Sequence, residues 1–111
     1  MSSSIAQGQE QQGHYPQKFA ELAERVLFGD MWKRTQLTPR ERSLTTVAAL
    51  VAMYRLEQLP FHLQRARDNG LSVDELNEVI THLAFYSGWP TAASALKLLR
   101  ELEAHPVSDQ E

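Results

Sequence analysis

The chain has 111 residues, of which 42% are hydrophobic and 23% are charged, a composition typical of one globular domain. Its formal net charge of −3 provides no basic surface for nucleic acid or for an acidic membrane. Cysteine is absent, which excludes disulfides, thiolate nucleophiles and cysteine-ligated metals. The polar N-terminus and the lack of an apolar run of about 18 residues predict no signal peptide and no membrane span, so the expected location is the cytoplasm.

The first half of the chain predicts a tail and two helices. Residues 1–14 are rich in serine, glutamine and glycine, which predicts a disordered tail. Apolar residues at spacings of three and four then predict a helix over 16–28, which ends at Gly29. The sequence from Thr38 to Glu41 forms a capping box with proline at the first helical position, and this second helix is expected to reach about Arg55.

Three further helices are expected over about 59–69, 72–86 and 90–105. Gly70 and Gly88 separate them, and a Ser72–Glu75 capping box begins the middle one. The last helix is expected to turn small and apolar residues inward: Ala92, Ala93, Ala95, Leu96, Leu99 and Leu102. The predicted fold is an all-α, single-domain helical bundle over 15–105, followed by a flexible tail at 106–111. Because a chain of this size buries only about two-thirds of its unfolded surface, oligomerisation is expected to supplement the core.

His62 is the first candidate for chemistry, because an imidazole titrates near neutral pH. Glu57 precedes it by five residues and would orient it or raise its pKa. The alternative is a histidine in the first turn of a helix that is hydrogen-bonded to the backbone. Arg42 lies one turn into a helix, where its charge opposes the helix dipole, so a carboxylate partner from the protein or from a ligand is expected. The alternative for Arg42 is a solvated surface arginine.

His82, Tyr86 and Trp89 have the spacing that places side chains on one face of a continuous helix. Such a face would line a pocket or a subunit interface, where tyrosine and tryptophan are enriched. The alternative is a wet helix face with one packed aromatic ring. No metal site is predicted, because the histidines lack the spacing of metal-binding motifs.

Four segments, in the right order and spacing, resemble the carboxymuconolactone decarboxylase family. They are FGDMWKR at 28–34, LTPRERSL at 37–44, QLPFH at 58–62 and AFYSGWP at 84–90. The resemblance covers about residues 19–100. It implies an all-α fold of the alkylhydroperoxidase-D-like type, assembled as a homo-oligomer, either a hexamer built as a trimer of dimers or a trimer.

The resemblance also implies two chemistries. One branch of the family decarboxylates 4-carboxymuconolactone in aromatic-compound catabolism, and the other reduces peroxides through a C-x-x-C pair that precedes a histidine. Aligned on His62, the two cysteines would fall at Arg55 and Gln58. Neither residue can perform thiol chemistry, so thiol-dependent peroxidase activity is not expected.

The resemblance therefore favours a cofactor-free lyase that acts on 4-carboxymuconolactone or a related small carboxylated lactone. Such an enzyme needs a cation for a carboxylate, hydrogen-bond donors and a general acid, whereas the ring carbonyl accepts the electron pair. The roles assigned are His62 as general acid, Glu57 to orient it, Arg42 for carboxylate binding, and His82, Tyr86 and Trp89 for substrate binding. The proton donor is either His62 or His82. Two alternatives are a non-catalytic binding or assembly protein of the same fold, and an isomerase or hydrolase that acts on another small acid.

Overall fold

The computed structural model describes residues 15–105, so the two predicted tails lie outside the described residues. Within 15–105 every regular element is a helix, which confirms the predicted all-α class. The chain divides into two compact units, one ending at Pro39 and the other beginning at Arg40. The prediction of one domain over 15–105 stays a prediction. None of the helices between residues 15 and 105 is long and apolar enough to cross a membrane.

Over its described residues, from 15 onward, the first unit contains one helix and a short 3-10 turn. Helix α2 spans Gln17–Leu22 and continues as a π-helical segment, η1, over Ala23–Phe28, which confirms the helix predicted over 16–28. The turn η2 spans Met31–Lys33. The helix ends before Gly29, where a larger residue would not fit, because a Cβ atom there would lie 2.6 Å from the Arg25 carbonyl oxygen.

The helix of the first unit has an apolar face that is about half exposed. Phe28 and Trp32 are buried, and their rings stack at a centroid distance of 6.3 Å. On the polar side, Glu21 lies 3.8 Å from Lys18 and 3.6 Å from Arg25, exposed ion pairs that contribute little stability. The exposed apolar side chains are Phe19, Leu22, Val26 and Leu27.

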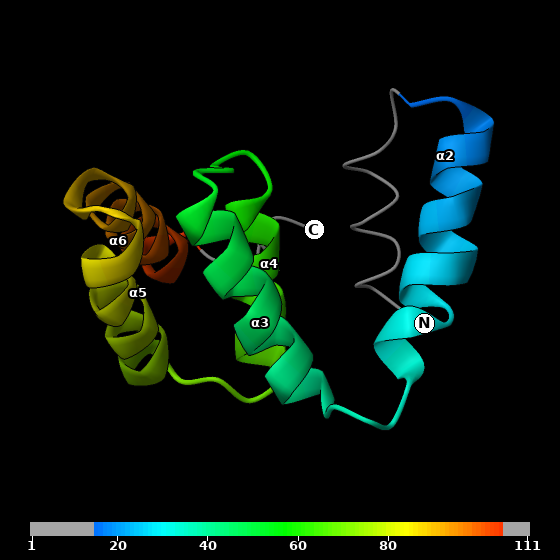
Figure 1. The fold of residues 1–111 in the computed structure, drawn as a ribbon, viewed down its shortest axis with the longest axis horizontal. Helices are drawn as coiled ribbons and strands as arrows, with labels where there is room; N and C mark the ends of the chain where they lie inside the picture. Colours follow the sequence, from blue (N-terminus) through cyan, green and yellow to red (C-terminus); the bar gives the residue numbers. More distant parts are fainter. Residues whose placement is uncertain (1–14, 106–111) are drawn as a thin grey trace. The chain divides into compact units, whose positions relative to one another are not determined.

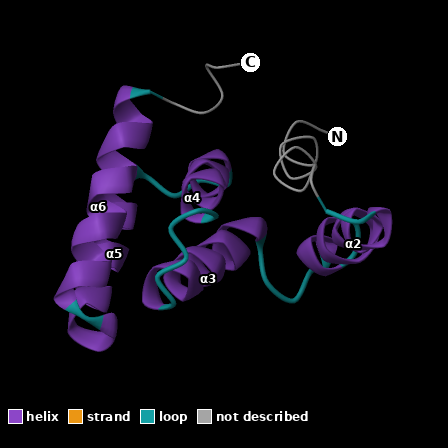
Figure 2. Cartoon of the chain, turned by 90° about the horizontal axis from the view of Figure 1, so that it is seen from above, coloured by secondary structure: helices purple, strands orange, loops and turns teal. Residues whose placement is uncertain are grey.

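The second unit, as far as residue 105, contains four helices: α3 over Pro39–Ala52, α4 over Leu59–Asp68, α5 over Val73–Ser87 and α6 over Trp89–Ala104. Helices α5 and α6 form a hairpin and lie side by side, and α4 packs against α6 (Figures 1 and 2). Burial of apolar surface between these helices is the main stabilising term. The largest fully buried apolar side chains of this core are Val47, Val51, Leu59, Leu63, Leu76, Ile80 and Leu99.

Local sequence signals set the boundaries of α4, α5 and α6. The Ser72 hydroxyl accepts a hydrogen bond from the Glu75 N–H, and the Glu75 carboxylate accepts one from the Ser72 N–H, both at 3.0 Å. The predicted capping box of α5 is thereby confirmed. Gly70 and Gly88 have φ angles of 104° and 110°, which side-chain-bearing residues seldom adopt. Both predicted helix stops are therefore confirmed.

Two sequence predictions about the second unit are wrong in detail. Helix α3 ends at Ala52 instead of about Arg55, because Tyr54 has a left-handed φ of 60° and the Arg55 N–H bonds back to the Leu50 carbonyl at 2.9 Å. Ala93 is exposed, although an inward position was expected. Neighbouring residues of a helix point about 100° apart, so Ala93 is turned away from the face that its neighbours bury.

The polar contacts between helices show which helix ends lie close together in the second unit. Asn69, just after α4, donates to the Ser43 hydroxyl in the first turns of α3 at 2.9 Å. Arg40 and Glu75 form an ion pair between the beginnings of α3 and α5. In Figure 1 the start of α3 and the α4–α5 connection accordingly lie on the lower side, with the α3–α4 connection on the upper side. Residues early in α3 are therefore neighbours of residues late in α4.

Candidate functional site

His62 lies in the first turns of α4 between two buried residues, Phe61 and Leu63. Its Nδ1 atom is buried, and its ring meets the Phe61 ring edge-on at a centroid distance of 4.9 Å. Burial, and after it the positive charge of Arg65, lower the pKa of His62 from 6.5 to about 4. The predicted rise of this pKa through Glu57 is therefore wrong, and the imidazole of the free protein is neutral at pH 7.

His62 begins a row of polar side chains along one face of α4. Arg65 follows it by three residues and Asn69 by seven, spacings that return to the same helix face. Asn69 reaches Ser43, whose side chain is fully buried, and Arg42 precedes Ser43 directly. We call His62, Arg65, Asn69, Ser43 and Arg42 the polar row. It contains two predicted site residues, His62 and Arg42, and the Asn69–Ser43 hydrogen bond connects the end of the helix of one to the helix of the other.

The two arginines give the polar row a positive charge. The Nε atom of Arg42 and the Nε and Nη1 atoms of Arg65 are buried. Burial lowers the pKa of Arg65, while the nearby Asp68 raises it, and a guanidinium remains charged in either case. Because charges interact more strongly away from bulk water, partly buried guanidinium groups attract an anion more strongly than exposed ones. The polar row therefore suits a small anionic ligand.

His62 and Arg42 lie toward opposite ends of the polar row. His62 precedes Asn69 by seven residues, which corresponds to roughly 10 Å along a helix axis. Arg42 precedes Ser43 in the chain, and the Ser43–Asn69 hydrogen bond lies at the far end of the row. Arg65 lies between them and is the charged group closer in sequence to His62. The spacing of His62 and Arg65 on a predicted helix was the signal that could have identified Arg65.

Glu57 lies in the connection between α3 and α4 and is exposed. The main chain places it at the beginning of α4, because the carbonyl of the adjacent Gln58 accepts the His62 N–H at 3.4 Å. The Tyr54 hydroxyl from the same connection lies 3.4 Å from the Ser94 hydroxyl of α6. An open hollow of about 540 Å³ is lined by Tyr54, Arg55, Leu56, Glu57 and Gln58. The structure thus brings Glu57 to the same end of α4 as His62.

His82 and Tyr86 share the outer face of α5. Their ring centroids are 5.0 Å apart, as their spacing predicts. His82 follows the fully buried Ile80 by two residues, a rotation of about 200° around the helix, so it points away from the core. The Tyr86 side chain is 77% exposed. Within one copy of the chain, the structure does not bring this face to His62.

Trp89 does not continue the face formed by His82 and Tyr86. Helix α5 ends at Ser87, and the left-handed φ of Gly88 redirects the chain before Trp89 begins α6. The Trp89 ring meets the Phe85 ring edge-on at 6.5 Å. The exposed fractions of Phe85, Tyr86 and Trp89 are 77%, 77% and 68%. We call these three residues the aromatic corner.

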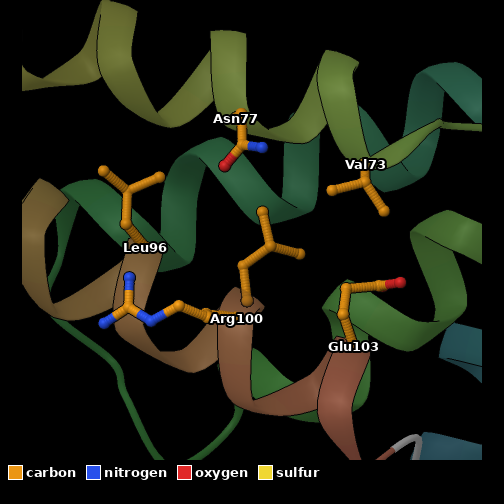
Figure 3. Close-up of a pocket in the computed structure, with 6 residues that line it drawn as sticks. Val73, Asn77, Leu96, Arg100 and Glu103 are labelled. Atoms are coloured by element: carbon orange, nitrogen blue, oxygen red, sulfur yellow. The ribbon is translucent and has the colours of Figure 1, made fainter.

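A second hollow, of about 410 Å³, lies between α5 and α6 (Figure 3). It is lined by Val73, Asn77, Leu96, Leu99, Arg100 and Glu103. Glu103 also pairs with Arg67 of α4 at 3.0 Å. None of the predicted site residues lines this hollow. Among residues 15–105, no group of three acidic or histidine side chains is arranged to hold a metal ion. Cofactor-free chemistry stays a prediction.

A model of the carboxymuconolactone decarboxylase family matches residues 17–101, from the start of α2 to the last turns of α6. The chain belongs to this family. The resemblance drawn from the four sequence segments is thereby confirmed. As a member without cysteine, the chain has no thiol for the redox chemistry of the peroxide-reducing branch.

Two curated members resemble the chain over most of its length. It is 35% identical over 88 residues to a 4-carboxymuconolactone decarboxylase of Acinetobacter baylyi (strain ATCC 33305 / BD413 / ADP1), which covers 79% of this chain and 66% of that protein. It is 30% identical over 76 residues to the nitrosuccinic acid decarboxylase npaB of Metarhizium robertsii (strain ARSEF 23 / ATCC MYA-3075), which covers 68% of this chain and 53% of that protein. The chain thus spans less than two-thirds of the first relative and about half of the second.

Proposed function

We propose that this family member is a cofactor-free carboxy-lyase acting on 4-carboxymuconolactone or a related small carboxylated acid in aromatic-compound catabolism, in the cytoplasm. Two similar proteins carry the name of a decarboxylase, which supports this reaction class. The observation that carries the proposal is the partly buried His62 beside the Arg65 guanidinium on one face of α4.

In the proposed reaction the bond between the substrate carbon and a carboxylate breaks, and CO2 leaves. The electron pair passes into the conjugated carbonyl of the substrate, and a proton is then added to carbon. His62 supplies this proton. Its imidazole is neutral in the free protein at pH 7, but a bound anion raises its pKa and favours the protonated form. Glu57 orients the imidazole, and Arg42 adds positive charge that attracts the acid to the polar row.

Turnover of 4-carboxymuconolactone, measured by release of CO2 and by loss of ultraviolet absorbance, tests the proposal. We expect His62→Gln to lower kcat about 100-fold, because general acid catalysis contributes rate factors of about 100 to 10,000. His105→Gln changes an exposed histidine at the end of α6 and is the matched control. Circular dichroism should show the helical fold in all three proteins.

Four outcomes of this assay decide between the alternatives. Loss of activity in His62→Gln alone supports the lyase. Equal activity of His62→Gln and the wild type would remove His62 from the reaction. Absence of turnover by the folded wild-type protein would favour a non-catalytic binding protein, and an isomerised or hydrolysed product detected by NMR would identify the other enzyme class.

We also propose that the chain forms a homo-oligomer, a hexamer or a trimer, through the aromatic corner. Exposed aromatic side chains of this extent mark an interaction site, and a second copy would bury them. In such an assembly His82, Tyr86 and Trp89 meet substrate at the boundary between two copies.

Light scattering at micromolar concentration measures this assembly. We expect Phe85→Glu to shift the protein to lower mass, because a charge in the aromatic corner would have to be buried. Lys97→Glu, on the exposed side of α6, is the control and should leave the mass unchanged. A monomeric wild-type protein would contradict the proposal.

A further inference from the structure

Arg65 is the cation nearest to His62 along the polar row. The two residues are separated by one helical turn, so their side chains lie on the same face of α4. Both are partly buried, and the Nδ1 atom of His62 and the Nε and Nη1 atoms of Arg65 are buried. An anion that contacts one of these side chains therefore lies within reach of the other.

We propose that Arg65 binds the carboxylate that the substrate retains while His62 protonates the carbon from which CO2 has left. This inference rests on the proposed function and narrows the substrate class to acids with at least two carboxylates. Arg65 suits this role because the donors of a guanidinium lie in a planar fork that matches a carboxylate. A guanidinium has five N–H donors, so it can bind a ligand while it also bonds to the protein.

The electrostatics of α4 support this assignment. The positive charge of Arg65 is one of the two causes that lower the pKa of His62. A carboxylate bound at Arg65 offsets that charge and adds a negative charge beside the imidazole, so the pKa of His62 rises. Binding of the acid at Arg65 would therefore also create the protonated imidazole that the reaction needs.

The other arginines of this unit fit the role less well. Arg67 points about 200° away from Arg65 around α4 and pairs with Glu103 at 3.0 Å. Arg55 lines the open hollow at the α3–α4 connection and is exposed. Arg42 lies on α3 next to Ser43, whose partner Asn69 is seven residues, or roughly 10 Å along the axis of α4, from His62. Arg65 alone combines partial burial with a place one turn from His62.

Binding of succinate, a dicarboxylate that serves here as the probe, tests the proposal independently of turnover. We expect succinate to shift the NMR signals of the His62 ring and of the Arg65 side chain in the wild-type protein. Arg65→Gln should weaken succinate binding about tenfold or more, and Arg65→Lys should weaken it less, because lysine keeps the charge but loses the planar fork. Arg67→Gln changes an arginine on the opposite face of the same helix and should bind succinate as the wild type does. Succinamide, which has no carboxylate, should not bind.

The kinetics give a second readout. Arg65→Gln should raise the KM for 4-carboxymuconolactone by a larger factor than it lowers kcat, because the lost contact exists before as well as during the reaction. Equal weakening of succinate binding by Arg67→Gln, or shifts confined to the Arg55 or Arg42 signals of the wild type, would overturn the proposal. The wild-type spectra show which arginine succinate contacts, so they test the proposal even if Arg65→Gln does not fold.

The two proposals fail differently. Succinate binding that depends on Arg65, in a protein without decarboxylase activity, would refute the proposed function and keep the anion site. Decarboxylase activity with an unchanged KM in Arg65→Gln would keep the function and refute the role of Arg65.

Discussion

Lowering the pH from 7 to 4 is expected to reduce the free energy of unfolding by about 3 kcal/mol through His62 alone. In the folded protein, burial and Arg65 lower the pKa of His62 from 6.5 to about 4. Between these two values the unfolded chain binds a proton at His62 that the folded chain does not bind. Protonation therefore favours unfolding, and stability is lost as the pH falls from about 6.5 towards 4.

Urea unfolding of the wild type and of His62→Gln at a series of pH values measures this contribution. Carboxylates also lose their stabilising effect in acid. The pKa of Glu75, for example, is lowered by the backbone N–H of Ser72 and by Arg40. Glu75 is present in both proteins, so its contribution cancels when their free energies of unfolding are subtracted. We expect the stability of His62→Gln to depend less on pH in this window. Parallel pH profiles for the two proteins would contradict the buried, neutral state of His62.

Leu99→Ala is expected to lower the free energy of unfolding by about 3 to 4 kcal/mol, the range for a leucine truncated in a rigid core. Leu99 is 1% exposed and belongs to the core shared by α4, α5 and α6. The truncation removes apolar burial and leaves a cavity that the surrounding helices fill only in part.

Leu98→Ala is the matched control, because it makes the same chemical change one residue earlier in α6. Leu98 is only partly buried at the edge of the core. Its truncation should lower the free energy of unfolding by about 1 kcal/mol, because it removes less buried apolar area than the truncation of Leu99. Equal losses for the two variants, measured by urea unfolding, would mean that α6 faces the core differently from the described structure.

Much of the helical architecture could be predicted because its signals are local. A capping box at Ser72 and glycines at positions 70 and 88 each act within a few residues, and each was recognised in the sequence. The end of α3 was missed because Tyr54 adopts a left-handed backbone that tyrosine rarely takes. Its hydroxyl lies near Ser94, forty residues away, and no local pattern predicts such a contact.

The candidate site could be predicted only in part, for the same reason. His62 was identified by its chemistry and Arg42 by its opposition to the helix dipole. The hydrogen bond that connects their two helices joins Asn69 and Ser43, which lie twenty-six residues apart. The sequence also could not show whether the face with His82 lines a pocket, an interface or solvent, because helical spacing identifies neighbours on a face but not what that face contacts.

The hydrogen bond between Asn69 and Ser43 affects how the arginines of two helices are spaced. Ser43 is fully buried, so the contact cannot slide without opening the packing between α3 and the end of α4. The α3 backbone at Arg42 is therefore held in place against the end of the helix that carries Arg65 and His62. The arrangement of positive charge around the proposed acid site thus depends on a pair of neutral residues that need not touch the acid.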